Sequence, residues 1–264
     1  MSIKVDDNWW RDLFDEIYLL SDARSVCNEK LTNQEVNFLE DTLDLDKSSS
    51  ILDLCGGQGR HSLELSRRGY MNVTVLDYSK YLLATGEKIA KREKLNTIFI
   101  QGDARNTGLP GQSYQFIIIM ASSFGYFVNE DENVNILREA CRLLFPRGRI
   151  LLDLTDRDYA INNFKSNSFH RVNKDITVRR DRELGNDIIF SREIVISEKK
   201  GCIKDRTYCT RLYTPEKISE IMYHVGFSTI TFRKDFMNRR SKGDFGCMTN
   251  RMVVLGEKAD DIQY

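Results

Sequence analysis

The chain has 264 residues, a length that suits one large α/β domain or such a core with a modest insertion. Lysine plus arginine equal aspartate plus glutamate at 39 each, so the excess of cationic side chains that drives non-specific nucleic-acid binding is absent. The amino-terminal stretch has no apolar segment typical of a signal peptide, and every apolar run is far shorter than the roughly 20 residues of a membrane span. We therefore expect a soluble, cytoplasmic protein.

Six cysteines are scattered along the chain, and no two of them have the Cys-x-x-Cys spacing of metal fingers. The chain is long enough to bury a substantial core without a disulfide or metal. We therefore expect reduced cysteines and no metal site.

The first 45 residues are predicted to be helical. Trp9, Trp10, Phe14 and Tyr18 form an apolar stripe at roughly helical spacing. The segment 32–35 reads Thr-Asn-Gln-Glu, a capping-box pattern that predicts the start of a second helix.

From residue 51 onward, short apolar strands alternate with helices. This alternation predicts a parallel sheet joined by right-handed crossovers. The predicted strands are 51–54, 72–76, 97–100, 115–120 and 149–154. The helices are predicted at 59–68, at 79–93 with Ser79 as the cap, and around 134–144, followed by a turn at 146–148.

Residues 155–213 break this rhythm. Strands are predicted at 176–180, 187–197 and 202–213, and the turns between them are too short for crossovers, which predicts an inserted antiparallel sheet. We call residues 155–213 the insertion.

The remainder of the chain is predicted to complete the large sheet. Thr214 is a typical N-cap of a helix and Pro215 is typical of the first helical position. The predicted helix ends at Gly226. Two final strands follow at 227–234 and 252–257, and a polar loop between them holds Arg239, Arg240 and Lys242.

The strongest chemical signal is the segment Ile-Leu-Asp-Leu-Cys-Gly-Gly-Gln-Gly at 51–59. A strand runs into a glycine-dense turn, where missing side chains let the backbone approach a ligand, and a helix with free amide groups follows. A dinucleotide fingerprint would require Gly-x-Gly-x-x-Gly/Ala, but Ser62 occupies the last position. Asp53 would repel a pyrophosphate and suits a ligand that carries an ammonium group.

Two further acidic residues follow the next two strands. Asp77 is placed to accept hydrogen bonds from ribose hydroxyls, and Asp103 is placed to accept from an exocyclic amine. With Asp53 they put three carboxylates at the carboxyl ends of consecutive strands, where α/β sheets bind ligands.

These motifs resemble the class I, Rossmann-like S-adenosylmethionine-dependent methyltransferases over residues 31–154 and 214–257. One departure is Cys55, where the family usually has glycine. Small-molecule methyltransferases of this family are also similar at 14–19, 59–62 and 211–215. The resemblance implies S-adenosylmethionine as the cofactor and a seven-stranded sheet with an antiparallel insertion after the fifth strand. It implies cofactor contacts from Tyr18, Asp53, Cys55, Gly56, Gly57, Gly59, Asp77, Tyr78, Gly102, Asp103, Ala104, Met120 and Ala121.

The resemblance also implies three parts. Residues 1–45 would form a helical lid, residues 46–154 and 214–264 the cofactor-binding core, and the insertion a cover over the acceptor. We expect a small-molecule acceptor and leave open whether the protein is a monomer or a homodimer.

Candidate catalytic residues are Tyr18, Tyr126 and His170, which could orient an acceptor or close over the cofactor. His61 is interpreted as a packing or cofactor-side residue, and His224 as a surface residue. The insertion is rich in arginine, which predicts either a solvated, salt-bridged sheet face or a clamp for an acidic acceptor. These arginines are Arg179, Arg180, Arg182, Arg192, Arg206 and Arg211.

Three alternatives remain. Nucleobase amine methyltransferases usually carry Asn/Asp-Pro-Pro-Tyr/Phe after the fourth strand, whereas residues 120–124 read Met-Ala-Ser-Ser-Phe without proline, so a nucleic-acid or protein acceptor is disfavoured. A cofactor-binding regulator without catalysis, or an NAD-dependent dehydrogenase, would also use an α/β crevice. Ligand titration separates the dehydrogenase from the rest.

Overall fold

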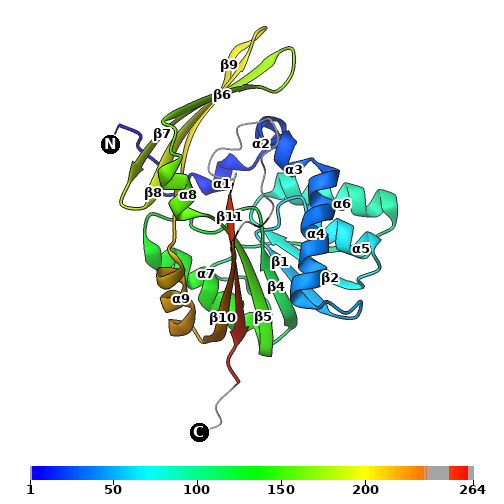
Figure 1. Cartoon of the computed structure of the whole chain (residues 1–264). Helices are drawn as coiled ribbons and strands as arrows, with labels where there is room; N and C mark the ends of the chain where they lie inside the picture. The colour runs from blue at the N-terminus through cyan, green and yellow to red at the C-terminus, as the bar shows by residue number, and fades with distance from the viewer. Residues whose placement is uncertain (1, 235, 237–249, 261–264) are drawn as a thin grey trace.

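The computed structural model describes residues 2–234, 236 and 250–260 and contains two sheets (Figure 1). The predicted loop residues Arg239, Arg240 and Lys242 lie outside the described residues. The large sheet has seven strands in the order β10-β11-β5-β4-β1-β2-β3. Its strands are β1 (Ser50–Leu54), β2 (Asn72–Asp77), β3 (Ile98–Gln101), β4 (Tyr114–Ile119), β5 (Leu144–Thr155), β10 (Phe227–Lys234) and β11 (Arg251–Lys258).

Strands β1 to β5 are mutually parallel, and β11 is antiparallel to both of its neighbours, β5 and β10. The predicted fold is confirmed. The five parallel strands therefore direct their carboxyl ends, and the loops that follow them, to one edge of the sheet.

Alternate residues of the central strands enter two different cores. On one face, side chains such as Leu52, Ile117 and Leu152 pack against α7 (Glu130–Leu143) and α9 (Pro215–His224). On the other face, Ile51, Ile118 and Leu151 pack against α4 (Glu29–Leu43) and α5 (Arg60–Arg67). Figure 1 shows these helix pairs on opposite sides of the sheet, with α6 (Lys80–Glu93) beyond α5. Burial on both faces explains why the strands read as continuous apolar runs.

Two predicted helix starts are confirmed and one is wrong. Ser79 caps α6 and Thr214 caps α9, each accepting a backbone amide hydrogen bond of 3.1 Å. Helix α4 begins at Glu29 instead of Thr32, because the Asn28 side chain accepts a 3.0 Å hydrogen bond from the amide of Leu31. Asparagine is a stronger cap than threonine, and the earlier start adds a turn of helix.

The turn predicted at 146–148 lies inside β5, which begins at Leu144. The pairing of β4 with β5 shifts register here, and Arg147 has a left-handed φ of 60°. The Pro-Arg-Gly sequence thus produces an irregularity within the strand where a break was expected.

The insertion contains a four-stranded antiparallel sheet in the order β6-β7-β8-β9. The antiparallel pairing is confirmed, but the short helix and the first strand were not predicted. Asn186 and Asp187 connect β7 to β8 with φ of 51° and 57°, which is the conformation of a two-residue hairpin turn. The elements are α8 (Arg157–Asn162), β6 (Asn167–Arg171), β7 (Ile176–Gly185), β8 (Ile188–Ser197) and β9 (Gly201–Arg211).

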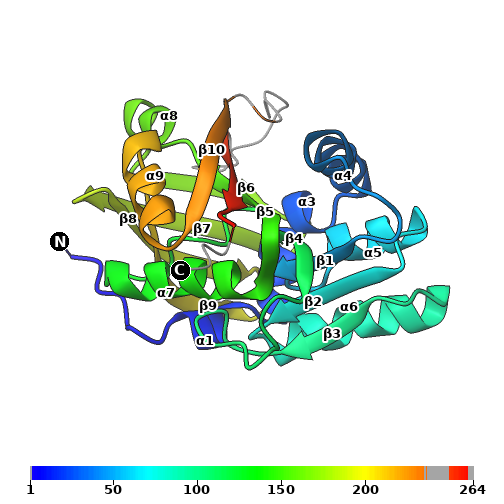
Figure 2. The same ribbon diagram turned by 90° about the horizontal axis from the view of Figure 1, so that it is seen from below.

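The amino-terminal segment forms three short helices where one apolar stripe was predicted: α1 (Trp10–Leu13), α2 (Glu16–Ser21) and α3 (Ala23–Val26). Trp9, Trp10 and Leu13 pack with Ile188 and Cys209 of the insertion. Figure 1 shows α1 and α2 between the small sheet and the large sheet, and Figure 2 shows α1 beside β9. The segment is therefore held between the two sheets. Within the residues that the structure describes, no helix has the length and apolar character needed to cross a bilayer.

Candidate active site

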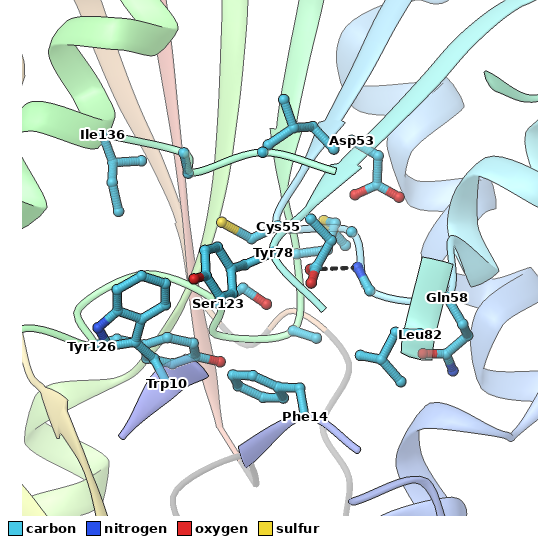
Figure 3. A pocket seen from close by; sticks show the side chains of 18 of the residues that line it. Trp10, Phe14, Asp53, Cys55, Gln58, Tyr78, Leu82, Ser123, Tyr126 and Ile136 are labelled. Atoms are coloured by element: carbon cyan, nitrogen blue, oxygen red, sulfur yellow. Dashed lines mark hydrogen bonds between the residues drawn. The ribbon is translucent and has the colours of Figure 1, made fainter. Parts of the chain in front are cut away.

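A first cavity lies at the carboxyl ends of β1, β2, β3 and β4, and Trp10 and Phe14 of the amino-terminal segment also line it (Figure 3). It measures about 920 Å³, including the space at its open mouth, which is within the usual range for a ligand site. The predicted residues that line it are Tyr18, Asp53, Cys55, Gly56, Gly57, Asp77, Tyr78, Gly102, Asp103, Ala104, Met120 and Ala121.

The loop after β1 needs its glycines for two physical reasons. A Cβ on Gly56 would lie 2.6 Å from Cγ of Asp53, which no side chain tolerates. Gly57 has a φ of 59°, in the left-handed region that glycine adopts without strain. Cys55 also has a left-handed φ of 61°, so the residue that departs from the family pattern occupies a position where glycine would be relaxed. The Cys55 side chain lines the cavity.

Asp53 is completely buried at the end of β1. Its Oδ2 accepts a 2.8 Å hydrogen bond from the Ser62 hydroxyl, whereas Oδ1 has no hydrogen-bond partner among the described residues. Burial raises the pKa of Asp53 to about 7, against a lowering influence of Ser62 and Arg60. A carboxylate oxygen that faces a cavity without a partner is a site for a cationic donor.

Asp77 fixes the glycine loop to the end of β2. Its Oδ2 accepts a 2.8 Å hydrogen bond from the Gly57 amide, and its Oδ1 accepts one of 2.8 Å from the Ser79 amide. Burial nevertheless raises the pKa of Asp77, with these amide bonds opposing the rise. Each carboxylate oxygen can accept a further bond, so Asp77 can hold the loop and a ligand together.

Asp103 is paired with Arg105, a contact that was not predicted from the sequence. Arg105 holds both of its carboxylate oxygens, with Nε 3.0 Å from Oδ1 and Nη2 2.5 Å from Oδ2. The same guanidinium lies over the rings of Trp10 and Phe127, 4.8 and 4.7 Å from their centroids. Burial opposes ionisation, but Arg105 keeps the pKa of Asp103 below its ordinary value. Asp103 therefore presents a fixed, ionised carboxylate to the cavity.

Aromatic side chains close the cavity on the side away from Asp53. Figure 3 shows Trp10, Phe14 and Tyr126 there. Trp10 meets Tyr78 edge-on at 4.6 Å, and Phe14 stacks on Tyr126 at 5.7 Å. Aromatic pairs of this kind exclude water and stabilise the closed arrangement.

A second cavity of about 1040 Å³, measured with its open mouth, adjoins the first. One wall comes from the amino-terminal helices, and the facing wall comes from strands β7, β8 and β9 of the insertion. The residues common to both cavities are Phe14, Tyr18, Val26, Arg60, Ala121 and Tyr126. Two molecules bound in the two cavities would meet at these residues.

Tyr18 and Tyr126 stand at this junction. Burial raises the pKa of both phenols well above the ordinary value, with nearby Asp22 adding to the effect at Tyr18 and Cys55 at Tyr126. Both side chains are consequently protonated at neutral pH. They can donate and accept hydrogen bonds, but they cannot serve as resting bases.

His61 is a structural residue beside the first cavity. It is buried, and its Nε2 lies 2.9 Å from Oε2 of Glu35, which also pairs with Arg60. Burial lowers the pKa of His61 to about 4, so the ring is neutral and donates to Glu35. Burial alone would raise the pKa of Glu35, but Arg60 and His61 hold it well below its ordinary value. The packing interpretation of His61 agrees with this arrangement.

Two predicted site residues do not line either cavity. Gly59 is the residue before α5, and a Cβ there would lie 2.9 Å from Phe99 and Val75, so its glycine serves close packing. His170 lies on β6, where its Nε2 is 3.1 Å from the Ser21 carbonyl oxygen. The structure thus gives His170 a contact with the amino-terminal segment and no place at the cavity. His224 is exposed, as expected.

Several lining residues were not predicted. Trp10, Gln58, Leu82, Arg105, Ser123, Phe127 and Ile136 line the first cavity. Most come from segments whose apolar side chains could equally form core, and only the three-dimensional path of the chain separates the two cases.

Comparisons with known proteins agree with this geometry. Residues 51–148 match the family model described as a methyltransferase domain. YqeM of Bacillus subtilis, named as a candidate methyltransferase, is 25% identical over 198 residues, which are 73% of this chain and 78% of that protein.

Two solved structures share the fold. The CcbJ methyltransferase of Streptomyces caelestis has a TM-score of 0.75 at 18% identity, covering 96% of this chain and 99% of that one. The sugar N-methyltransferase KedS8 of Streptoalloteichus sp. has a TM-score of 0.65 at 15% identity, covering 98% and 99%.

Proposed function

Because the chain is a class I, Rossmann-like methyltransferase that uses S-adenosylmethionine, we propose that it methylates a nitrogen, oxygen or carbon atom of a small-molecule acceptor held in the second cavity. The observation that carries this proposal is the second cavity itself. It joins the first at Tyr18, Ala121 and Tyr126, and the insertion covers it. A covered cavity suits a small molecule better than a nucleic acid or a protein surface.

The residues of the first cavity fit S-adenosylmethionine. The partnerless Oδ1 of buried Asp53 would supply charge for the amino-acid end, and the bare backbone of Gly56 and Gly57 in the same cavity lining would let that end approach closely. Asp77 would hold the ribose hydroxyls, and Asp103 would hold the adenine amine. The remaining contacts would come from Tyr18, Cys55, Gly57, Tyr78, Gly102, Ala104, Met120 and Ala121.

When bound, the cofactor supplies an activated methyl group together with its leaving group. The protein's own residues then have to align the acceptor, exclude water and keep the acceptor atom nucleophilic. Phe14, Tyr18 and Tyr126 surround the junction with aromatic rings, and the two phenols can orient an acceptor through hydrogen bonds. Neither phenol removes a proton at neutral pH, so an acceptor with a lone pair, such as a neutral amine, fits the site best.

Two structural neighbours are named as an amino pentose methyltransferase and a sugar N-methyltransferase, which supports a nitrogen acceptor as the first class to test. In this proposal residues 1–45 act as the lid, residues 46–154 and 214–264 as the cofactor-binding core, and the insertion as the acceptor cover. The balanced charge of the chain argues against RNA as the acceptor.

The test is a calorimetric titration of the full chain with S-adenosylmethionine, S-adenosylhomocysteine and NAD, followed by methyl-transfer assays on amines, phenols and carbon acids. Binding of the adenosyl ligands with turnover of a small acceptor is the expected result. If the adenosyl ligands bind tightly but only RNA or protein is methylated, the small-molecule acceptor is wrong. If the adenosyl ligands bind but no acceptor is methylated, the result supports a regulatory role.

A further inference from the structure

The insertion presents an ordered set of side chains to the second cavity. Its three longest strands pair in register, so residues on the cavity face form rows across β7, β8 and β9. The first row is Arg180–Glu193–Arg206, the second is Arg182–Ser191–Tyr208, and the third is Leu184–Ile189–Thr210. All of these residues except Leu184 line the second cavity.

Charges in the first row are matched by carboxylates. Arg180 Nε lies 2.6 Å from Glu193, and its Nη2 lies 3.0 Å from Asp22 of the lid. Arg206 Nη2 lies 2.6 Å from the other oxygen of Glu193, and Nη1 lies 3.3 Å from Asp15. These two arginines are salt-bridged, as predicted, but they are almost completely buried, so this part of the sheet face is not solvated.

Arg60, a third arginine of the second cavity that also lines the first, is paired with Glu35. Arg182 differs from all three. Its guanidinium has no carboxylate partner and no side-chain hydrogen bond among residues 2–234, 236 and 250–260, although it lies half-buried in the cavity wall. The Ser191 and Tyr208 side chains stand beside it in the same row, and both bring a hydroxyl group to the cavity wall.

A half-buried guanidinium without a counter-charge is a ready site for an anion, because its planar fork matches carboxylate and phosphate oxygens. The amino-terminal segment brings the apolar side chains Trp9, Leu13 and Phe14 to the same cavity, and together they form an aromatic side of it. We propose that the acceptor is an organic anion whose carboxylate or phosphate group binds Arg182 while its apolar body rests on this aromatic side. The inference rests on the proposed function, since it names the class of acceptor for the same site.

The test uses three probes of similar shape: benzoate, phenyl phosphate and neutral benzamide. Each is titrated calorimetrically into the full chain saturated with S-adenosylhomocysteine. We expect the anions to bind roughly 10- to 100-fold more tightly than benzamide, the usual effect of a hydrogen bond to a charged group. The tighter of the two anions identifies a carboxylate or a phosphate as the natural group.

Arg182→Met should abolish this preference, and Arg182→Lys should retain part of it because lysine keeps the charge but loses the fork. The matched control is Arg192→Met, since Arg192 is an arginine of β8 that pairs with exposed Asp205 and lines neither cavity. This control should leave all three affinities unchanged.

Failure of the inference and failure of the proposed function give different results. If S-adenosylhomocysteine does not bind the wild-type chain, the proposed function is overturned. If it binds, but the wild type takes up neither anion or Arg182→Met retains the anion preference, the anionic acceptor is overturned. Unchanged S-adenosylhomocysteine affinity in the variants shows that they are folded.

Discussion

Asp77 at the end of β2 accepts a 2.8 Å hydrogen bond from the Gly57 amide in the loop that follows β1. The carboxylate proposed to hold the ribose is therefore also the group that sets the position of the glycine loop. Binding and loop geometry depend on one side chain, so its removal affects both.

We expect Asp77→Ala to weaken S-adenosylhomocysteine binding by roughly a hundredfold, because two backbone bonds and the ligand contacts are lost together. Calorimetric titration measures the effect. The comparison variant Glu87→Ala, on exposed α6 surface, should bind as the wild type does. Equal affinities for the two variants would show that Asp77 does not hold the ligand.

The raised pKa of Asp53 predicts a pH-dependent cofactor affinity. In the free, folded protein this carboxyl group is protonated below a pKa of about 7, and a ligand ammonium group requires it to be ionised. Affinity should therefore fall as the pH drops below about 7, by up to roughly tenfold per pH unit, and should level off above that pH. His61 does not titrate in this range, because its pKa is about 4.

The variant Asp53→Asn tests whether ionisation of Asp53 causes this pH dependence of cofactor affinity. The variant should bind S-adenosylmethionine weakly with a flat profile between pH 5 and pH 8, roughly the range over which the carboxylate titrates. Calorimetry at several pH values provides the comparison, and a wild-type profile that is flat over the same range would contradict the assignment.

Glu35 is expected to be a major determinant of stability. It is buried and serves both Arg60 and His61, so Glu35→Ala leaves a largely buried guanidinium without its partner. Such a loss costs about 3–5 kcal/mol in the free energy of unfolding. Because the pKa of Glu35 is well below the ordinary value, this stabilisation is complete above the unfolded-state pKa of 4.5 and declines as the pH falls further.

Urea denaturation at neutral pH measures the Glu35 effect. Glu40→Ala, five residues later on the same helix, removes a carboxylate that pairs with the partly exposed Arg68 and Lys47, and it should cost about 1 kcal/mol or less. Similar losses in the free energy of unfolding for both variants would show that burial does not make the Glu35 ion pair more important than the exposed one.

Two adjacent tryptophans provide a test of which cavity binds the cofactor. Trp10 lines the first cavity and Trp9 lines the second, although both are buried to a similar extent. Trp10→Ala should weaken S-adenosylhomocysteine binding by roughly tenfold or more through lost aromatic contact, whereas Trp9→Ala should leave it nearly unchanged. Titration calorimetry on both variants measures these affinities. A larger loss of S-adenosylhomocysteine affinity in Trp9→Ala than in Trp10→Ala would contradict the assignment of the first cavity to the cofactor.

Much of the core could be predicted from the sequence because its strands are buried on both faces. The segment 227–234 matches β10, and the caps at Ser79 and Thr214 were located from local chemistry alone. Strand β6 was missed because its alternate residues are exposed at the edge of the small sheet, so no apolar pattern marks it.

The candidate site was predictable only in part. Residues adjacent to the glycine loop follow from local spacing, whereas the second cavity arises from long-range packing of the amino-terminal segment against the insertion. The sequence does not distinguish buried Arg180 from exposed Arg179, since that difference depends on which face of β7 meets the amino-terminal segment. The sequence also does not show that His170, on β6, contacts the Ser21 carbonyl oxygen and lines neither cavity.

The ion pairs between Asp22 and Arg180, and between Asp15 and both Lys204 and Arg206, join the amino-terminal segment to the insertion. If the spent cofactor leaves by movement of α1 and α2 away from the first cavity, these contacts must break or the insertion must move with the helices. We therefore expect product departure to limit the turnover rate and to become faster as ionic strength rises, because dissolved salt weakens the partly exposed pairs. The strands of the insertion that would contact the acceptor would then also influence the rate of product release.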